Sequence, residues 1–203
     1  MDGSARWEMR YLRNLFQRDP AWMVDTVLFG PGTDSLRMPR GDQPGQFPRT
    51  RETMAKYDAV VLGEIPVDQF DESDAQILRD FVTRGGGMVV IDGKYGRIAK
   101  LASERLSELI PVKHDERPPL VTQSIAPTRQ GLEHPMMNLI NDADHLQQFW
   151  KELPSPTTTV SVKPQAGGEV WAESIDEGGA ATPWLVTRLF GAGRVFYFAS
   201  DET

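Results

Sequence analysis

The chain has 203 residues, a length that suits one globular domain, and its 22 Lys and Arg against 29 Asp and Glu give a formal charge of −7. It contains no cysteine, which excludes a disulfide scaffold, a zinc–thiolate site and a cysteine nucleophile. The acidic balance argues against a broad nucleic-acid surface, which needs clustered Lys and Arg.

Membrane and export signals are not found in the sequence. The longest apolar runs are short, such as residues 88–91, whereas a bilayer span needs about 20 apolar residues. The first residues are polar and lack the apolar core of a signal peptide. The sequence therefore predicts a soluble chain with no membrane insertion by this segment.

The first half of the chain is predicted to alternate helices and strands. A helix is expected over residues 5–17, with Ser4 as its N-cap and an apolar face on a 3.6-residue period. The residues of that face are Trp7, Tyr11, Leu12 and Leu15. The pattern then predicts a strand over residues 24–29, a loop rich in Gly and Pro over residues 30–48 and a short helix over residues 51–56.

A strand, helix, strand unit follows. Residues 59–63 and 88–91 are apolar without alternation, as expected for strands that are covered on both faces. Asp71 is the predicted cap of the helix between them, and Gly85 is placed for the left-handed turn that ends it. The buried stripe of this helix is predicted to be Ile77, Leu78, Phe81 and Val82. The spacing fits a right-handed crossover, and a further helix is expected over residues 103–109.

Prolines divide the second half into shorter elements. The predicted elements are strands over residues 120–125, 169–173 and 184–189, a helix over residues 142–150 and a β-hairpin whose turn, residues 191–193, leads into residues 194–199.

These elements predict an α/β fold with a parallel core early in the chain and an antiparallel extension after it. Residues 24–29, 59–63 and 88–91 are expected to be neighbours in one mainly parallel sheet. Helices are expected on both faces of that sheet, because its strands are apolar throughout.

Five stretches of the sequence resemble the class I glutamine amidotransferase-like superfamily. Two of them are YDAVVLG at residues 57–63 and FVTRGGGMVVI at residues 81–91. The other three are ARWEMRYL at residues 5–12, GLEHP at residues 131–135 and GAGRVFYFASD at residues 191–201. More narrowly, their order and spacing resemble the amidotransferase-like domains of bacterial membrane proteins that contain von Willebrand factor A modules. The resemblance covers nearly the whole chain.

The resemblance implies a flavodoxin-like three-layer fold in which residues 1–203 form a single amidotransferase-like domain. Members of the family have a strand immediately before the stretch that begins here at Asp2, and they continue beyond the position of Thr203. The chain is therefore expected to be a fragment of a larger protein, less stable and more prone to aggregation than a version extended upstream by about ten residues. A natural variant without both ends is the alternative.

An amidotransferase needs a nucleophilic cysteine on the sharp turn after a strand, and a histidine that activates it. The resemblance places Asp92 at that turn, within residues 92–96, where active relatives have the cysteine. A carboxylate cannot form the thioester through which the amide of glutamine is released. Cysteine-dependent glutaminase chemistry is therefore excluded, and no catalytic residue is predicted.

Glu64 and Asp92 follow predicted parallel strands at their carboxyl ends, where ligands bind open α/β sheets. We expect their side chains to share a surface cleft, with Gly93, Lys94 and His134 as further candidate binding residues. Paired carboxylates there favour cations or hydroxyl-rich ligands over anions, and they can also act as an acid–base pair. The alternative is structural, with Asp92 capping the following turn and Glu64 solvated in a loop.

Other patterns favour structural roles. Residues 85–87 are all glycine, but they precede a strand, which is typical of helix termination and not of a phosphate-binding loop. His114, His134 and His145 lack the spacing of metal ligands, so neither a metal site nor a cofactor is predicted.

Some aromatic residues have two possible roles. Trp150, Trp171 and Trp184 either line a sugar-binding face or pack in the core, and core packing is the commoner role. His134 either lies near a pocket, as in related trehalose-utilisation-like proteins, or forms a turn before Pro135.

Three functions remain open at this stage. The favoured one is a non-catalytic module of a larger cell-envelope protein that binds a small hydroxyl-rich ligand, another domain of the same polypeptide or an envelope protein. The second is a hydrolase-type enzyme that uses Asp92 and Glu64. The third is a structural or oligomerisation domain, the role ascribed to amidotransferase-like domains of some β-galactosidases.

Overall fold

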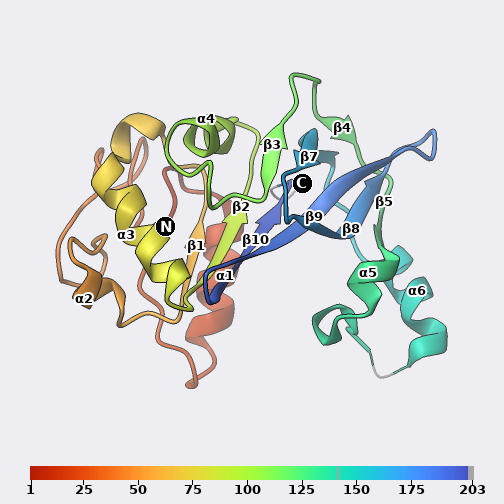
Figure 1. Cartoon of the computed structure of the whole chain (residues 1–203), viewed down its shortest axis with the longest axis horizontal. Helices are drawn as coiled ribbons and strands as arrows, with labels where there is room; N and C mark the ends of the chain where they lie inside the picture. The colour runs from red at the N-terminus through yellow and green to blue at the C-terminus, as the bar shows by residue number, and fades with distance from the viewer. Residues whose placement is uncertain (141, 201–203) are drawn as a thin grey trace.

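A computed structural model gives the fold of residues 1–140 and 142–200 (Figure 1). The helices are α1 Trp7–Gln17, α2 Arg51–Met54, η1 Val67–Gln69, α3 Glu72–Thr83, α4 Arg97–Glu104, α5 Arg129–Leu132, η2 Pro135–Met137 and α6 Ala143–Glu152. The strands are β1 Ala59–Leu62, β2 Gly87–Ile91, β3 Val112–His114, β4 Leu120–Val121, β5 Ser124–Pro127, β6 Thr158–Thr159, β7 Val162–Pro164, β8 Glu169–Ile175, β9 Ala181–Phe190 and β10 Gly193–Phe198.

A mixed sheet of six strands, in the order β1-β2-β10-β9-β8-β5, forms the centre of the molecule. β1 and β10 flank β2 in parallel, with Val61 opposite Val89 and Tyr197 opposite Val90. The pairs β10–β9, β9–β8 and β8–β5 are antiparallel. The α/β class is confirmed, but the expectation of a mainly parallel sheet is wrong. β8, β9 and β10 follow one another through short turns, which can join only antiparallel neighbours.

The predicted strand, helix, strand unit is confirmed as β1, α3 and β2. Asp71 caps α3, since its Oδ1 accepts the backbone N–H of Asp74 at 3.0 Å while Oδ2 of Asp74 accepts the N–H of Asp71 at 3.0 Å. This reciprocal box satisfies two N–H groups that the first turn leaves unpaired. Gly85 has a φ of +115°, so it ends the helix in a conformation that favours glycine.

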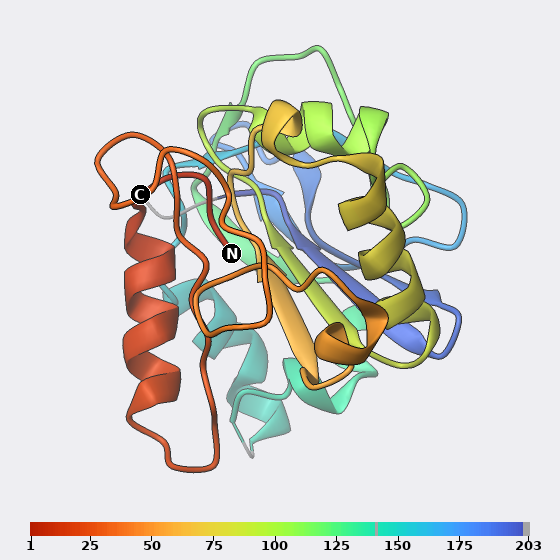
Figure 2. The ribbon, with the colours of Figure 1, turned by 90° about the vertical axis from the view of Figure 1, so that its left-hand side faces the viewer.

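Two apolar cores lie on opposite faces of the sheet. β10 shows the division, because Val195 and Tyr197 are buried in the core beneath α3 and α4, whereas Phe196 and Phe198 pack against the core that includes Trp150 of α6. Figure 2 shows α1 and α3 on opposite sides of the sheet. The expectation of helices on both faces is therefore confirmed.

Residues 24–29 do not form the expected strand. Their contact with the sheet runs through Asp2, whose N–H donates to the carbonyl of Val27 at 3.0 Å and whose carbonyl accepts the N–H of Phe29 at 3.3 Å. The Met1 ammonium in turn donates to the carbonyl of Val61 at 2.7 Å. Residues 1–3 therefore lie between this segment and β1, so the predicted pairing of residues 24–29 with the other two strands is wrong.

Two further boundaries differ from the prediction. The helix expected over residues 103–109 is α4, Arg97–Glu104, because Gly96 takes a φ of +64° and the chain turns into the helix at once. Residues 120–125 divide into β4 and β5, which belong to different sheets. The predicted helix over residues 142–150 and the predicted hairpin are confirmed as α6 and as β9 with β10.

The predicted N-cap of α1 is also wrong. Ser4 does not cap this helix, whose N-cap residue is Arg6, and α1 contains no buried residue. Trp7, Tyr11 and Leu15 are exposed on its outer side. Across the described residues, no helix combines the length and the apolar character that crossing a membrane requires.

Candidate functional site

Glu64 and Asp92 follow β1 and β2 at the carboxyl end of the parallel strands. The backbone N–H of Asp92 donates to the carbonyl of Phe198 at 3.0 Å, which ties the turn after β2 to the end of β10. Both acidic side chains have 0% exposure. The expectation that they share a surface cleft is therefore wrong, and they instead form the acidic part of a buried polar cluster.

Both oxygens of the Asp92 carboxylate accept hydrogen bonds from the protein. Oδ1 accepts the N–H of Gly93 at 2.8 Å, and Oδ2 accepts the phenol of Tyr197 at 2.6 Å. Nε2 of His114 lies 2.6 Å from the same Oδ2. The pKa of Tyr197 is raised well above 10, mainly because the phenol is buried and secondly because the charge of Asp92 is close. The phenol is therefore protonated and donates the hydrogen bond. The expected turn-capping role of Asp92 is present in its contact with Gly93.

His114, like Tyr197, is a residue of this cluster that sequence reasoning missed. It ends β3, its side chain is 13% exposed, and its Nε2 is 3.2 Å from the phenol oxygen of Tyr197. His114 also lines an open pocket of about 470 Å³, together with Lys113 and Gln165. His114 therefore connects buried Asp92 with a solvent-facing hollow. No spacing motif joins His114 to Asp92, because the contact depends on how β3 crosses the end of the sheet.

Glu64 has one satisfied and one unsatisfied oxygen. Oε2 accepts the backbone N–H of Arg97 at 3.1 Å, whereas Oε1 is buried and has no hydrogen-bond partner among the described residues. Burial is the main cause that raises the pKa of Glu64 to about 7; the hydrogen bond from Arg97 lowers it and the charge of Asp92 raises it further. Glu64 can therefore hold a proton near neutral pH, and the expectation of a solvated loop residue is wrong.

Two arginines hold the cluster to the surrounding backbone. Nε of Arg6 donates to Oδ2 of Asp2 at 2.9 Å, and the other nitrogens of its guanidinium reach the carbonyls of Ile91 at 3.3 Å and Asp92 at 3.4 Å. Nη1 of Arg97 donates to the carbonyl of Glu64 at 3.3 Å and to that of Gly3 at 3.0 Å. These charged donors satisfy strand-end carbonyls that lie beyond the regular ladder.

Gly93 closes the cluster by its lack of a side chain. A Cβ at this position would lie 2.6 Å from Oε1 of Glu64 and 2.7 Å from Nη1 of Arg6. Such distances are shorter than van der Waals contact, so no further atom fits between these groups. The geometry brings Glu64, Asp92 and Gly93 together as predicted, but in the interior and not at the surface.

The other two predicted binding residues lie apart from this cluster. Lys94 is exposed, with its ammonium nitrogen 5.4 Å from the ring centre of Tyr95. His134 precedes η2 and stacks on Trp171 with the ring centres 3.9 Å apart, in the core on the opposite face of the sheet from α3. The prediction that Lys94 and His134 share a cleft with Asp92 is therefore wrong. The structure fits the alternative, in which His134 forms a turn, because its backbone N–H donates to the carbonyl of Gly131.

The tryptophans of the second half take the core role. Trp171 and Trp150 are buried in the core that α5 and α6 cover, and Trp184 packs against both cores. The indole N–H of Trp150 donates to the carbonyl of Met137 at 3.2 Å, and that of Trp184 donates to Ser200 at 2.7 Å. Within the part of the chain that the structure describes, no group of three or more acidic or histidine side chains could hold a metal ion.

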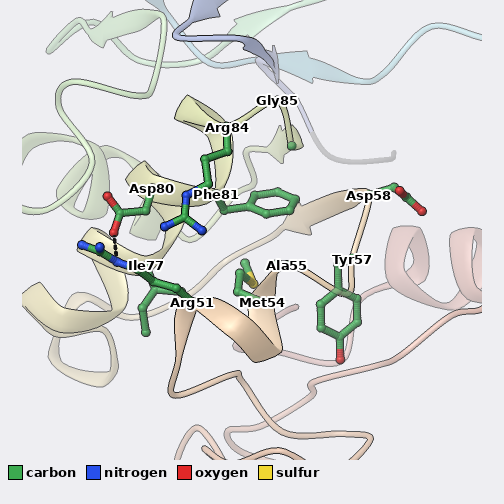
Figure 3. Close-up of a pocket in the computed structure, with 11 residues that line it drawn as sticks. Arg51, Met54, Ala55, Tyr57, Asp58, Ile77, Asp80, Phe81, Arg84 and Gly85 are labelled. Carbon is green, nitrogen blue, oxygen red and sulfur yellow. Dashed lines mark ion pairs between the residues drawn. The ribbon is translucent and has the colours of Figure 1, made fainter.

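A separate pocket of about 240 Å³ lies at the opposite end of the parallel strands (Figure 3). Asp58 precedes β1 and Gly86 precedes β2, so this pocket borders the amino ends of the strands. Figure 3 shows Arg51 and Asp80 paired across it. None of the predicted binding residues lines this hollow.

The sequence matches no protein-family model and no curated protein. Solved structures do resemble it. Cytoplasmic protein STM1381 from Salmonella typhimurium LT2 superposes with a TM-score of 0.64 and 22% identity, over 95% of this chain and 76% of that chain. Cytoplasmic protein STM3548 from Salmonella typhimurium gives a TM-score of 0.57 and 19% identity, over 76% of this chain and 65% of that chain. The N-terminal domain of mmIFT52 gives a TM-score of 0.55 and 10% identity, over 95% of this chain and 78% of that domain. At these identities the likeness shows the fold alone, and the chain shares a mixed α/β fold with these three proteins.

Proposed function

We propose that the chain is a non-catalytic amidotransferase-like module that binds a partner domain within a larger cell-envelope protein. The observation that carries the proposal is the state of Asp92. The resemblance places this residue at the nucleophile position, and in the structure it is fully buried with both carboxylate oxygens occupied by protein donors. A nucleophile must instead reach the substrate.

The fold supports the superfamily assignment. β1, α3 and β2 form a parallel crossover unit, β10 adds a third parallel strand, and helices lie on both faces of the sheet. We assign these elements to a flavodoxin-like three-layer core, to which β9, β8 and β5 add an antiparallel extension. In such a core the turn after β2 is a common place for a catalytic residue. The burial of Asp92 on this turn therefore supports a non-catalytic role.

The closed cluster favours a partner domain over a small ligand. Glu64 and Asp92 were the basis for expecting a hydroxyl-rich ligand, and the side chains of both are buried, so neither is open to a ligand at the surface. These strand-end side chains are therefore part of the interior of the fold. Recognition falls to the outer surface of the domain, where other parts of the same polypeptide or an envelope protein would bind.

Ammonia release from glutamine tests the inactive-site part of this proposal. Wild type and Asp92→Cys are compared, with Asp58→Cys as the control that places a thiol on the surface. We expect no turnover from any of the three, because the thiol of Asp92→Cys lies in a closed cluster. Turnover by the wild-type protein would overturn the proposal, and turnover by Asp92→Cys alone would show that the amidotransferase machinery is intact around position 92.

A second function, a hydrolase, is favoured by one observation. Asp92 orients His114, and His114 borders the pocket of about 470 Å³, which is the arrangement of a general base and its orienting carboxylate. A panel of ester, amide and glycoside substrates tests it with wild type and His114→Gln. Activity in the wild type that falls at least about a hundredfold in the variant would favour the hydrolase over the binding module.

A further inference from the structure

The outer side of α1 is an exposed apolar stripe. Trp7, Tyr11 and Leu15 follow one another at four-residue spacing, and they are 54%, 61% and 63% exposed. The rings of Trp7 and Tyr11 are stacked, with centres 5.9 Å apart. In Figure 2, α1 stands at the outside of the molecule with no other element beyond it.

The loop after α1 extends this apolar surface. Met23 is 99% exposed and Trp22 is 52% exposed, with the ring of Trp22 packed 4.9 Å from that of Phe16 on the helix. We use "α1 face" for the surface formed by these two residues together with the stripe, namely Trp7, Tyr11, Leu15, Trp22 and Met23. Contiguous apolar surface of this kind marks an interaction site on a folded protein.

The same segment is basic although the chain is acidic. Residues 5–23 contain four Arg, of which Arg6 has a buried side chain paired with Asp2, against one Glu and one Asp, while the rest of the chain has 18 basic and 27 acidic residues. Among the described residues, the ion pairs include none made by Arg10, Arg13 or Arg18. The guanidinium of Arg10 lies 5.1 Å from the ring centre of Trp7. The α1 segment therefore combines large exposed rings with arginines that make no ion pair within the part of the chain that the structure describes.

We propose that the α1 face docks on the surface of an anionic phospholipid bilayer. Trp and Tyr side chains prefer the level of the headgroups, where the ring is apolar and its polar atom stays hydrated. Arginines beside them attract anionic lipid, and helices of this composition lie in the plane of the interface without spanning it. α1 meets these requirements along its exposed side, and the exposed side chains of Trp22 and Met23 follow its end in the chain.

The charge distribution favours a bilayer over a second copy of the chain. A symmetric contact between two α1 faces would bring Arg10 and Arg18 of both copies together, which is unfavourable. Anionic headgroups instead neutralise them. The remainder of the chain has nine more acidic than basic residues, so the other faces are repelled and the protein binds in one orientation. This inference does not rest on the state of Asp92.

Vesicle flotation of the full chain tests the proposal. The probes are vesicles of phosphatidylcholine alone and of phosphatidylcholine mixed with phosphatidylglycerol. We expect several-fold more protein on the anionic vesicles at low salt, and a decline as sodium chloride is raised. Combined Trp7→Gln, Tyr11→Gln and Leu15→Gln should abolish binding. Combined Arg10→Gln, Arg13→Gln and Arg18→Gln should lower it to the level of phosphatidylcholine alone.

The controls are Val121→Thr and Leu189→Thr, which change exposed apolar side chains elsewhere on the surface. Both should bind the anionic vesicles like wild type. Equal binding to the two vesicle types, no binding to either, or α1 variants that bind like wild type would each overturn the proposal. Self-association in sedimentation velocity that the Gln variants of the stripe abolish, without any preference for anionic lipid, would also overturn it and assign the α1 face to a protein contact.

Discussion

The phenol oxygen of Tyr197 lies 2.6 Å from Oδ2 of Asp92, so a side chain of β10 reaches the residue that follows β2. Nε2 of His114 shares the same oxygen at 2.6 Å. Three elements distant in sequence therefore meet at one buried carboxylate. Because the phenol of Tyr197 donates to a carboxylate that is removed from water, the contact stabilises the arrangement of the strands.

Tyr197→Phe should destabilise the protein by about 1–3 kcal/mol, because it leaves buried Asp92 with one fewer donor while keeping the ring that fills the core. The free energy of unfolding is measured by urea titration at neutral pH. Tyr95→Phe is the matched control, since Tyr95 is exposed and its ring contacts survive the change. Equal losses in the two variants would contradict a stabilising bond between Tyr197 and Asp92.

Glu64 should make stability fall as the pH rises. Its pKa of about 7 in the folded protein lies above the ordinary value of 4.5, so the folded state binds the extra proton. That stability is complete below pH 4.5 and is lost as the pH rises through 7. The loss is on the order of 3 kcal/mol.

Glu64→Gln isolates this effect, because the amide keeps an acceptor for the N–H of Arg97 and does not titrate. Urea titrations of both proteins from pH 5 to pH 8 should show the variant gaining on wild type as the pH rises. A difference between the two that stays constant with pH would contradict a raised pKa for Glu64.

Gly93→Ala should cost about 2 kcal/mol or more, since the new methyl group would overlap Glu64 and Arg6. Gly178→Ala is the control, because its Cβ would meet nothing closer than 3.4 Å and its backbone conformation is open to alanine. Thermal unfolding followed by circular dichroism compares the two. If Gly93→Ala has the same unfolding temperature as Gly178→Ala and wild type, the side chains around Gly93 are packed less tightly than the structure shows.

Local pattern was enough to predict much of the early fold. The cap at Asp71, the glycine turn at Gly85 and the apolar runs of β1 and β2 are each encoded within a few residues, so their identification needed no tertiary information. The strand expected over residues 24–29 failed because a strand needs a partner along its length. That segment meets residues 1–3 at a single bridge.

The candidate site was predicted only in part, for a related reason. The position of Glu64 and Asp92 at the strand ends follows from the crossover rule, but their burial depends on side chains that arrive from elsewhere. Arg6 comes before β1 in the sequence and His114 comes after β2, and both contact Asp92. The apolar period of α1 correctly predicted a helix. It did not predict which side of the helix faces the sheet, because that depends on the neighbouring elements.

Thiol accessibility at position 92 tests the central claim, that the site is closed, most directly. The chain has no cysteine, so Asp92→Cys carries a single thiol and its reaction with Ellman's reagent has no background. Asp58→Cys supplies the rate of an exposed thiol, and circular dichroism checks that both variants are folded. A closed cluster predicts that the thiol at position 92 reacts at least about a hundredfold more slowly than the one at position 58, and reaches its rate only when urea unfolds the protein. Equal rates in the folded proteins would contradict the account, because they would show an open turn at which a ligand or substrate could bind.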